Sequence, residues 1–165
     1  MRKWVIEVAL TLTISGLACA QQLSPEVREI VKTDAPVVAL THVRIIDGTG
    51  APAKDNQTVV LAHGKILSVG DAASAPPKDA QVIDLPGYSV LPGLVGMHDH
   101  MFYPAGGDVF HEMADSFPRL YLAGGVTTIR TTGSIEPYTD LLIKQGIDRG
   151  QTVGPHMHVT GPYLE

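Results

Sequence analysis

The sequence predicts an α/β fold in which a small β-sandwich or barrel precedes parallel βαβ units like those of a (β/α)8 barrel. Short β-rich runs separated by glycine and proline fill residues 37–92, a pattern typical of small all-β units. After Pro92 the pattern becomes strand, helix, strand, helix, strand, which is typical of a parallel sheet. A complete barrel needs about 250 residues, and the chain has 165. We therefore expect an incomplete barrel in the N-terminal part of a longer protein.

The first twenty residues have the pattern of a secretory signal. Arg2 and Lys3 are basic, residues 8–17 are mostly apolar, and Ala18-Cys19-Ala20 is a small-residue cleavage site. The apolar run is too short to span a bilayer comfortably. We expect cleavage after Ala20 and an exported, periplasmic or secreted protein without a stable membrane anchor. A retained anchor and a lipoprotein attached through Cys19 remain as alternatives.

Composition narrows the classes of function. The chain is 44% hydrophobic and 18% charged, which is typical of a globular protein. Cys19 is the only cysteine, so a disulfide scaffold is excluded. The formal net charge is −5 and the cations are scattered, whereas nucleic-acid binding needs clustered cations. We therefore expect no nucleic-acid partner. A homo-oligomer remains open.

The elements follow in order along the chain. Residues 21–36 form a polar arm, in which Ser24-Pro25-Glu26 starts a short helix and Pro36 ends it. We then expect strands at 37–46, 58–62, 65–69, 81–85 and 88–91. The βαβ region adds strands at 94–97, 126–130 and 157–160, and helices at 108–122 and 137–147. Residues 101–107 are predicted to be a loop.

The strongest functional signal is His98-Asp99-His100, at the end of the apolar strand that begins at Leu94. Residues two apart in a strand point to the same face, so the two imidazoles can hold one divalent metal, with zinc the expected ion. The ends of barrel strands are where active sites lie. Asp99 should point to the opposite face and play a structural role. The alternative is a pair of interior histidines that only hydrogen-bond their neighbours.

Other candidates carry weaker signals. Arg130 ends the second barrel strand, where it could bind a substrate carboxylate or pair with a structural acid. His158, from a second His-x-His with His156, could face the pocket or simply pack in its strand. Tyr103 is expected on a loop that roofs the site, where it could bind the substrate. His111 and Glu112 are expected on a solvated helix face, because Asp115 breaks a His-Glu-x-x-His motif.

Three segments together resemble the metal-dependent amidohydrolase superfamily, and more narrowly its imidazolonepropionase-like and Xaa-Pro-dipeptidase-like members. They are 43–50 with 63–70 (VRIIDGTG, HGKILSVG), 82–87 with 91–100 (VIDLPG, LPGLVGMHDH), and 123–130 (AGGVTTIR). The family often has Asp where Gly96 and Thr131 stand, which leaves the substrate open.

The resemblance implies a (β/α)8 barrel whose first βαβαβ units are residues 93–165. Residues 37–92 would be the N-terminal part of a composite β-sandwich domain. His98 and His100 match the family's first two metal ligands, and one or two metal ions are implied. The other ligands and the catalytic residues are expected beyond Glu165, so the chain alone is expected to be inactive.

The implied activity is hydrolysis of an amide, cyclic amide or peptide C–N bond by metal-activated water, with a small amide or dipeptide as substrate. The alternative is a truncated, non-catalytic, exported fragment that only binds metal.

Overall fold

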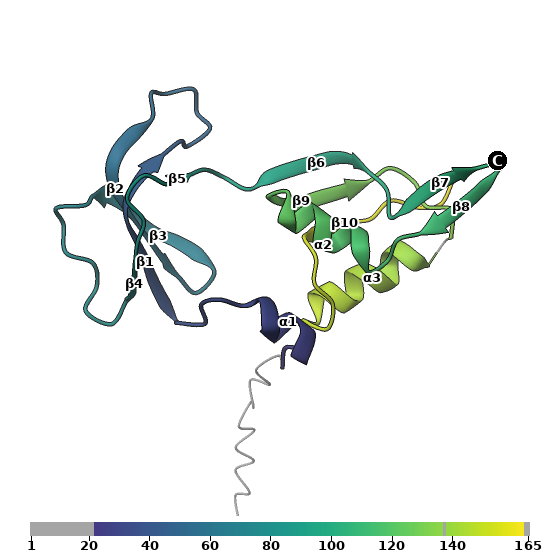
Figure 1. The fold of residues 1–165 in the computed structure, drawn as a ribbon, viewed down its shortest axis with the longest axis horizontal. Coiled ribbons are helices and arrows are strands. Elements are labelled where there is room, and N and C mark those ends of the chain that lie inside the picture. The colour runs from purple at the N-terminus through teal and green to yellow at the C-terminus, as the bar shows by residue number, and fades with distance from the viewer. Residues whose placement is uncertain (1–21, 137, 164–165) are drawn as a thin grey trace, which may run out of the picture.

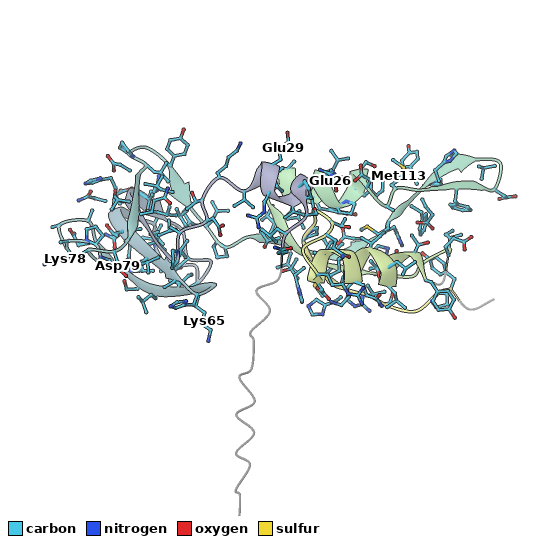
Figure 2. All side chains as sticks on the ribbon, turned by 90° about the horizontal axis from the view of Figure 1, so that it is seen from below. Glu26, Glu29, Lys65, Lys78, Asp79 and Met113 are labelled. Atoms are coloured by element: carbon cyan, nitrogen blue, oxygen red, sulfur yellow. The ribbon has the colours of Figure 1, made fainter. Side chains whose placement is uncertain are left out.

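The computed structural model describes residues 22–136 and 138–163. Figure 1 shows a five-stranded sheet at one end and, at the other, a three-stranded sheet with two helices and a hairpin. Figure 2 shows Lys78 and Asp79 at the outer end of the five-stranded sheet, remote from the three-stranded one, and Lys65 at the lower edge of the same sheet. The predicted signal segment lies outside the described residues. No helix among the described residues has both the length and the apolar character to cross a membrane.

Helix α1 (Pro25–Ile30) confirms the short helix predicted in the arm. Ser24 is its N-cap, and its Oγ accepts a hydrogen bond from the backbone N–H of Val27 at 3.2 Å. The same hydroxyl donates to the backbone carbonyl of Gln151 at 3.1 Å. The arm is thereby tied to the segment that leads into the last strand.

The five-stranded sheet is built from β1 (Val37–Ile45), β2 (Lys54–Ala62), β3 (Lys65–Asp71), β4 (Gln81–Asp84) and β5 (Ser89–Val90). Its order is β3-β2-β1-β4, with β5 also paired to β1. The three N-terminal strands are antiparallel neighbours, whereas β4 and β5 run parallel to β1. Buried residues of the sheet include Ala39, Val43, Val59 and Val60. Within residues 37–92 the structure shows this one sheet. The second layer that would make it a sandwich stays a prediction.

Strand β2 starts four residues earlier than predicted. Its first residues, Lys54 to Gln57, are polar, so the apolar and β-branched pattern indicated a strand only from Thr58. In the structure their backbone pairs with β1, because Lys54 lies opposite Ile45 and Gln57 opposite Val43. The polar side chains are exposed or half-buried, so backbone pairing rather than side-chain burial extends the strand.

The second sheet contains three parallel strands in the order β10-β9-β6. These are β6 (Leu94–Asp99), β9 (Val126–Thr131) and β10 (His156–His158), and the connections include helices α2 (Ser116–Ala123) and α3 (Thr139–Asp148). Met101, Ile129, Ile143 and Met157 form a buried core between the sheet and the helices. The opposite face of the sheet is open, with Val95 and Met97 exposed.

A hairpin stands where the sequence predicted a loop over 101–107 and the start of a helix at 108. Strands β7 (Phe102–Gly106) and β8 (Val109–Glu112) pair antiparallel, so both predictions are wrong for this segment. Gly106, Gly107 and Asp108 all have positive φ (93°, 58° and 58°), which gives the tight turn that joins the strands. The helical periodicity begins only at Ser116.

The hairpin also corrects the positions of His111 and Glu112. Both lie on β8 and not on a helix face; His111 is exposed, and Glu112 is half-buried with a carboxylate oxygen shielded from solvent.

Candidate metal centre

His98 and His100 lie side by side at the carboxyl end of β6. Their ring centroids are 5.3 Å apart, and the ring planes are nearly perpendicular at 84°. Strand β6 pairs with β9 through a bulge, because Gly96 lies opposite Ile129 while Asp99 lies opposite Thr131. Two residues, Met97 and His98, thus face the single residue Arg130. A bulge at a strand end is a common device for redirecting a side chain near a site.

The two imidazoles differ in their surroundings. His98 is exposed, whereas His100 is half-buried. The Nδ1 atom of His100 lies 3.4 Å from the backbone carbonyl oxygen of Gly133, and Nε2 lies 3.5 Å from the hydroxyl of Thr132. The ring of Phe102 packs beside that of His100, with centroids 4.7 Å apart. His100 is therefore held in place by contacts from β7 and from the loop after β9.

Asp99 points to the helix-covered side of the sheet, opposite the two histidines, as strand alternation predicts. It lies opposite Thr131, which is fully buried. Its charge, together with burial, raises the pKa of Tyr121 on α2, and burial is the larger cause. A Cβ atom added to Gly96 would lie 2.0 Å from the Asp99 carboxylate. Glycine at position 96 therefore makes room for Asp99. This is the position at which the amidohydrolase superfamily often has an aspartate instead.

A buried acidic pair near the histidines was missed by sequence reasoning. Asp140, in the first turn of α3, is only 1% exposed, and burial raises the pKa of its carboxyl group. A hydrogen bond from Thr131 and the charge of His100 act in the opposite direction. Burial likewise raises the pKa of Glu112, and the charge of Asp140 raises it further.

A signal for this burial is present in the sequence. Asp140 shares a helix face with Ile143 and Ile147, three and seven residues later, which pack in or against the core. An acid on the apolar stripe of a helix indicates a buried carboxyl group.

Arg130 and His158 come together on the open face of the sheet. They lie opposite each other in the pairing of β9 with β10. Both line a hollow of about 400 Å3, whose other lining residues are Val95, Met97, Thr128 and Ile129. Among the described residues, no acid lies within ion-pair distance of Arg130. Tyr103 is exposed on β7, opposite His111, and does not line this hollow.

The second histidine pair, His156 and His158, has nearly the same ring geometry as the first. Its ring centroids are 4.8 Å apart at 84°, and Met157 between them is buried. The two pairs lie on strands that are not neighbours, because β9 separates β6 from β10. The structure therefore gives no set of four imidazoles on adjacent strands.

His98 and His100 fit two positions of a zinc coordination shell, since neutral imidazole is a common zinc ligand. Within residues 22–136 and 138–163, no three His, Cys, Asp or Glu side chains gather closely enough to hold a metal ion. The described residues thus supply one side of a coordination shell.

Comparison with known proteins shows which proteins the chain resembles. A 106-residue stretch, 62% of the chain, is 33% identical to a dihydroorotase of Syntrophus aciditrophicus. A 76-residue stretch, 45% of the chain, is 41% identical to an imidazolonepropionase of Nocardia farcinica. The structure resembles that of a Bifidobacterium longum protein described as a prolidase, with a TM-score of 0.63 and 28% identity over 81% of the chain. No family model matches the chain.

The chain is similar in sequence and in structure to proteins of the amidohydrolase superfamily. The resemblance deduced from the sequence segments is thereby confirmed, and so is an α/β fold of this kind. The matched part of this chain spans 24% of the dihydroorotase, 19% of the imidazolonepropionase and 33% of the prolidase-like chain.

Proposed function

We propose that this chain is the N-terminal part of a metal-dependent hydrolase that cleaves an amide, cyclic amide or peptide C–N bond in a small molecule. The observation that carries the proposal is the pair of imidazoles, 5.3 Å apart, at the carboxyl end of β6. Parallel strands that begin a (β/α)8 barrel would direct that end toward the active site. The three-stranded sheet with its outer helices supports this arrangement.

His98 and His100 would hold a divalent metal, with zinc the expected ion. Such an ion, when bound, supplies water with a pKa near 7 and polarises a carbonyl oxygen. Polar groups at both ring nitrogens orient His100, so a metal ion that replaced the Thr132 hydroxyl at Nε2 would meet a lone pair with a defined direction. The remaining ligands and the proton-transferring acid would come from chain beyond residue 165.

Arg130 and His158 would bind the substrate. Both line the hollow on the open sheet face, and neither pairs with an acid there among the described residues. A guanidinium group binds a carboxylate through two parallel hydrogen bonds. Val95 and Met97 give the same hollow an apolar part. We therefore propose a substrate that carries a carboxylate and a short apolar group, such as a dipeptide.

We also propose that the protein is exported and loses residues 1–20. The support is the sequence pattern alone, with its basic start, apolar run and Ala18-Cys19-Ala20 site. N-terminal sequencing of the protein from its native source should begin at Gln21. A chain that still begins at Met1 would contradict the proposal, and a lipid on Cys19 would favour the lipoprotein alternative.

The test of function is the intact mass, metal content and hydrolytic activity of the protein from its native source. We expect a mass well above that of 165 residues, one or two zinc ions per chain, and cleavage of dipeptides or cyclic amides. Arg130→Lys keeps the charge but loses the two-pronged geometry, so KM for a carboxylate substrate should rise. A mass no larger than 165 residues, with no bound metal and no activity, would overturn the proposal.

A further inference from the structure

Resting on the proposed metal site, we propose that Thr160 is a positioning residue for His100. A polar network that runs from Thr160 through Thr131 and Gly133 would hold His100 in the tautomer with its proton on Nδ1. That tautomer leaves the lone pair of Nε2 available to a metal ion. Thr160 follows β10, two strands away from the histidine that it would control.

The network joins the ends of β9 and β10 with three hydrogen bonds. The hydroxyl of Thr160 donates to the backbone carbonyl of Thr131 at 2.9 Å, and the backbone N–H of Thr160 donates to the hydroxyl of Thr131 at 3.1 Å. The backbone N–H of Gly133 donates to the hydroxyl of Thr160 at 2.8 Å. One side chain, Thr160, therefore fixes the backbone on both sides of Thr132.

Gly133 is the link from this network to the histidine. Its backbone has a φ of +114°, which favours glycine, and an added Cβ would lie 2.6 Å from the ring of Tyr163. Its N–H is held by Thr160, and its carbonyl oxygen lies 3.4 Å from Nδ1 of His100. Because the amide and the tyrosine ring restrain this residue, its carbonyl has a set direction.

The Gly133 carbonyl decides the tautomer because a carbonyl oxygen can only accept a hydrogen bond. Nδ1 of His100 must therefore carry the proton for this contact to be favourable. Nε2 can then accept from the hydroxyl of Thr132, 3.5 Å away, in the metal-free protein, and that hydroxyl would turn away when a metal ion takes the lone pair. With the proton on Nε2 instead, lone pairs on Nδ1 and on the carbonyl oxygen would face each other. A backbone carbonyl that fixes the tautomer of a ligand histidine is a general feature of metal sites.

The far end of the network is anchored in the core. Thr131 is 0% exposed, and its hydroxyl already accepts the N–H of Thr160, so its own hydrogen is free to be donated. Asp140 of α3 is buried, and the hydroxyl of Thr131 acts as a donor that lowers the pKa of the Asp140 carboxyl group, against the larger effect of burial. The network is thus tied to a helix as well as to two strands, which makes it rigid.

The experiment compares Thr160→Val with Thr160→Ser. Valine keeps the shape and removes the hydroxyl, whereas serine keeps the hydroxyl. The first readout is 15N NMR of the imidazole of His100 in metal-free protein at alkaline pH. We expect the Nδ1–H tautomer in the wild type and in Thr160→Ser, and a mixture of both tautomers in Thr160→Val. Zinc affinity, the second readout, should fall about 10- to 100-fold in Thr160→Val, the range for loss of an outer-shell partner.

The two readouts separate this inference from the proposed function. If Thr160→Val changes the tautomer but even the wild type binds no zinc, the network stands and the metal site falls. If the wild type binds zinc and Thr160→Val has the same tautomer and the same affinity, Thr160 has no positioning role. If Thr160→Ser behaves like Thr160→Val, the hydroxyl is not responsible, and the inference is also overturned.

Discussion

The chain contains two His-x-His pairs that look alike in geometry and differ in their surroundings. His98 with His100 and His156 with His158 both have rings at 84°, with centroids 5.3 Å and 4.8 Å apart. The first pair ends its strand, and both ring nitrogens of His100 meet polar groups. The second pair lies within β10, and neither ring receives a hydrogen bond from the described residues.

The comparison shows that the spacing of the histidines is a property of any strand, whereas the surroundings separate the two pairs. Alternation along a strand brings residues two apart together wherever the pattern occurs. A ligand histidine needs in addition a partner that sets its tautomer and orientation. His100 has such a partner in Gly133, which lies beyond the end of β9. The second pair stands beside Arg130, whose positive charge disfavours a cation there.

The largest expected effect is on zinc affinity when one histidine is removed from each pair. His100→Ala should weaken zinc binding by more than roughly a hundredfold, because it removes a ligand and not merely an outer-shell partner. His158→Ala is the matched control and should leave zinc affinity within about threefold, well below that outer-shell range. Isothermal titration with zinc measures both. Equal losses of zinc affinity in the two variants would show that the two pairs do not differ as metal ligands.

A smaller effect is expected on stability when Gly96 is replaced by alanine. The new Cβ would lie 2.0 Å from the carboxylate of Asp99, so this half-buried side chain or the strand must shift beside the first pair. We expect a loss of about 1–3 kcal/mol in the free energy of unfolding, the usual cost of overpacking. Gly161→Ala, near the second pair, meets no atom within 4 Å and is the control. Urea unfolding with no difference between the variants would disprove the clash.

Loss of the N-cap at Ser24 should lower the free energy of unfolding by a smaller amount. Ser24 contacts the segment that leads to the second pair. Ser24→Ala removes the hydrogen bond from Val27 and the one to Gln151, five residues before His156. We expect a loss of about 1 kcal/mol, typical for an N-cap. Ser24→Thr retains a cap and should lose less. Thermal unfolding measures the effect, and zinc affinity should stay unchanged; a fall in zinc affinity would mean that the arm also supports the first pair.

The smallest effect concerns pH and the acid pair beside the first histidine pair. Burial raises the pKa of Glu112 above its ordinary 4.5, so the folded state favours the protonated form. The stability from this group is present below pH 4.5 and is lost as pH rises through the raised value. Glu112→Gln removes that loss, so its advantage over the wild type should grow from pH 4 to pH 7. Urea unfolding across this range is the measurement.

Asp84 provides a control of opposite sign for the pH experiment. A hydrogen bond from His42 lowers the pKa of its carboxyl group, with a second contribution from Thr41. Stability from Asp84 is therefore present above the ordinary carboxyl pKa and is lost as pH falls. Asp84→Asn should differ most from the wild type at neutral pH and least in acid. Parallel pH profiles for Glu112→Gln and the wild type would show that Glu112 does not titrate as proposed.

The sequence predicted the elements whose signals are local. Helix α1 has its cap and proline at Ser24 and Pro25, and strands β6 and β9 of the parallel sheet begin with apolar or β-branched residues. The hairpin over 102–112 was missed because its glycines resemble a loop and its residues also fit a helix. Only the positive φ values at Gly106 to Asp108, which depend on the final backbone, distinguish the two.

The candidate site likewise has one part that the sequence predicts and another part that it does not. The pairing of His98 with His100 follows from alternation along one strand and was predicted. The links from Thr160 to Thr131 and Gly133 join the ends of two strands that are about thirty residues apart in sequence. The apolar stripe of α3 signals that Asp140 is buried, but the groups that Asp140 meets depend on how this helix packs. Contacts of this kind follow from the tertiary fold and cannot be deduced from local spacing.

The most direct test of the account is a zinc titration of 15N-labelled protein. The four imidazoles of the two His-x-His pairs are followed by NMR. We predict that ring nitrogens of His98 and His100 shift together with the first equivalent of zinc, while those of His156 and His158 stay unchanged. A shift of the second pair first, or of neither pair, would contradict the claim that the end of β6 is the metal centre.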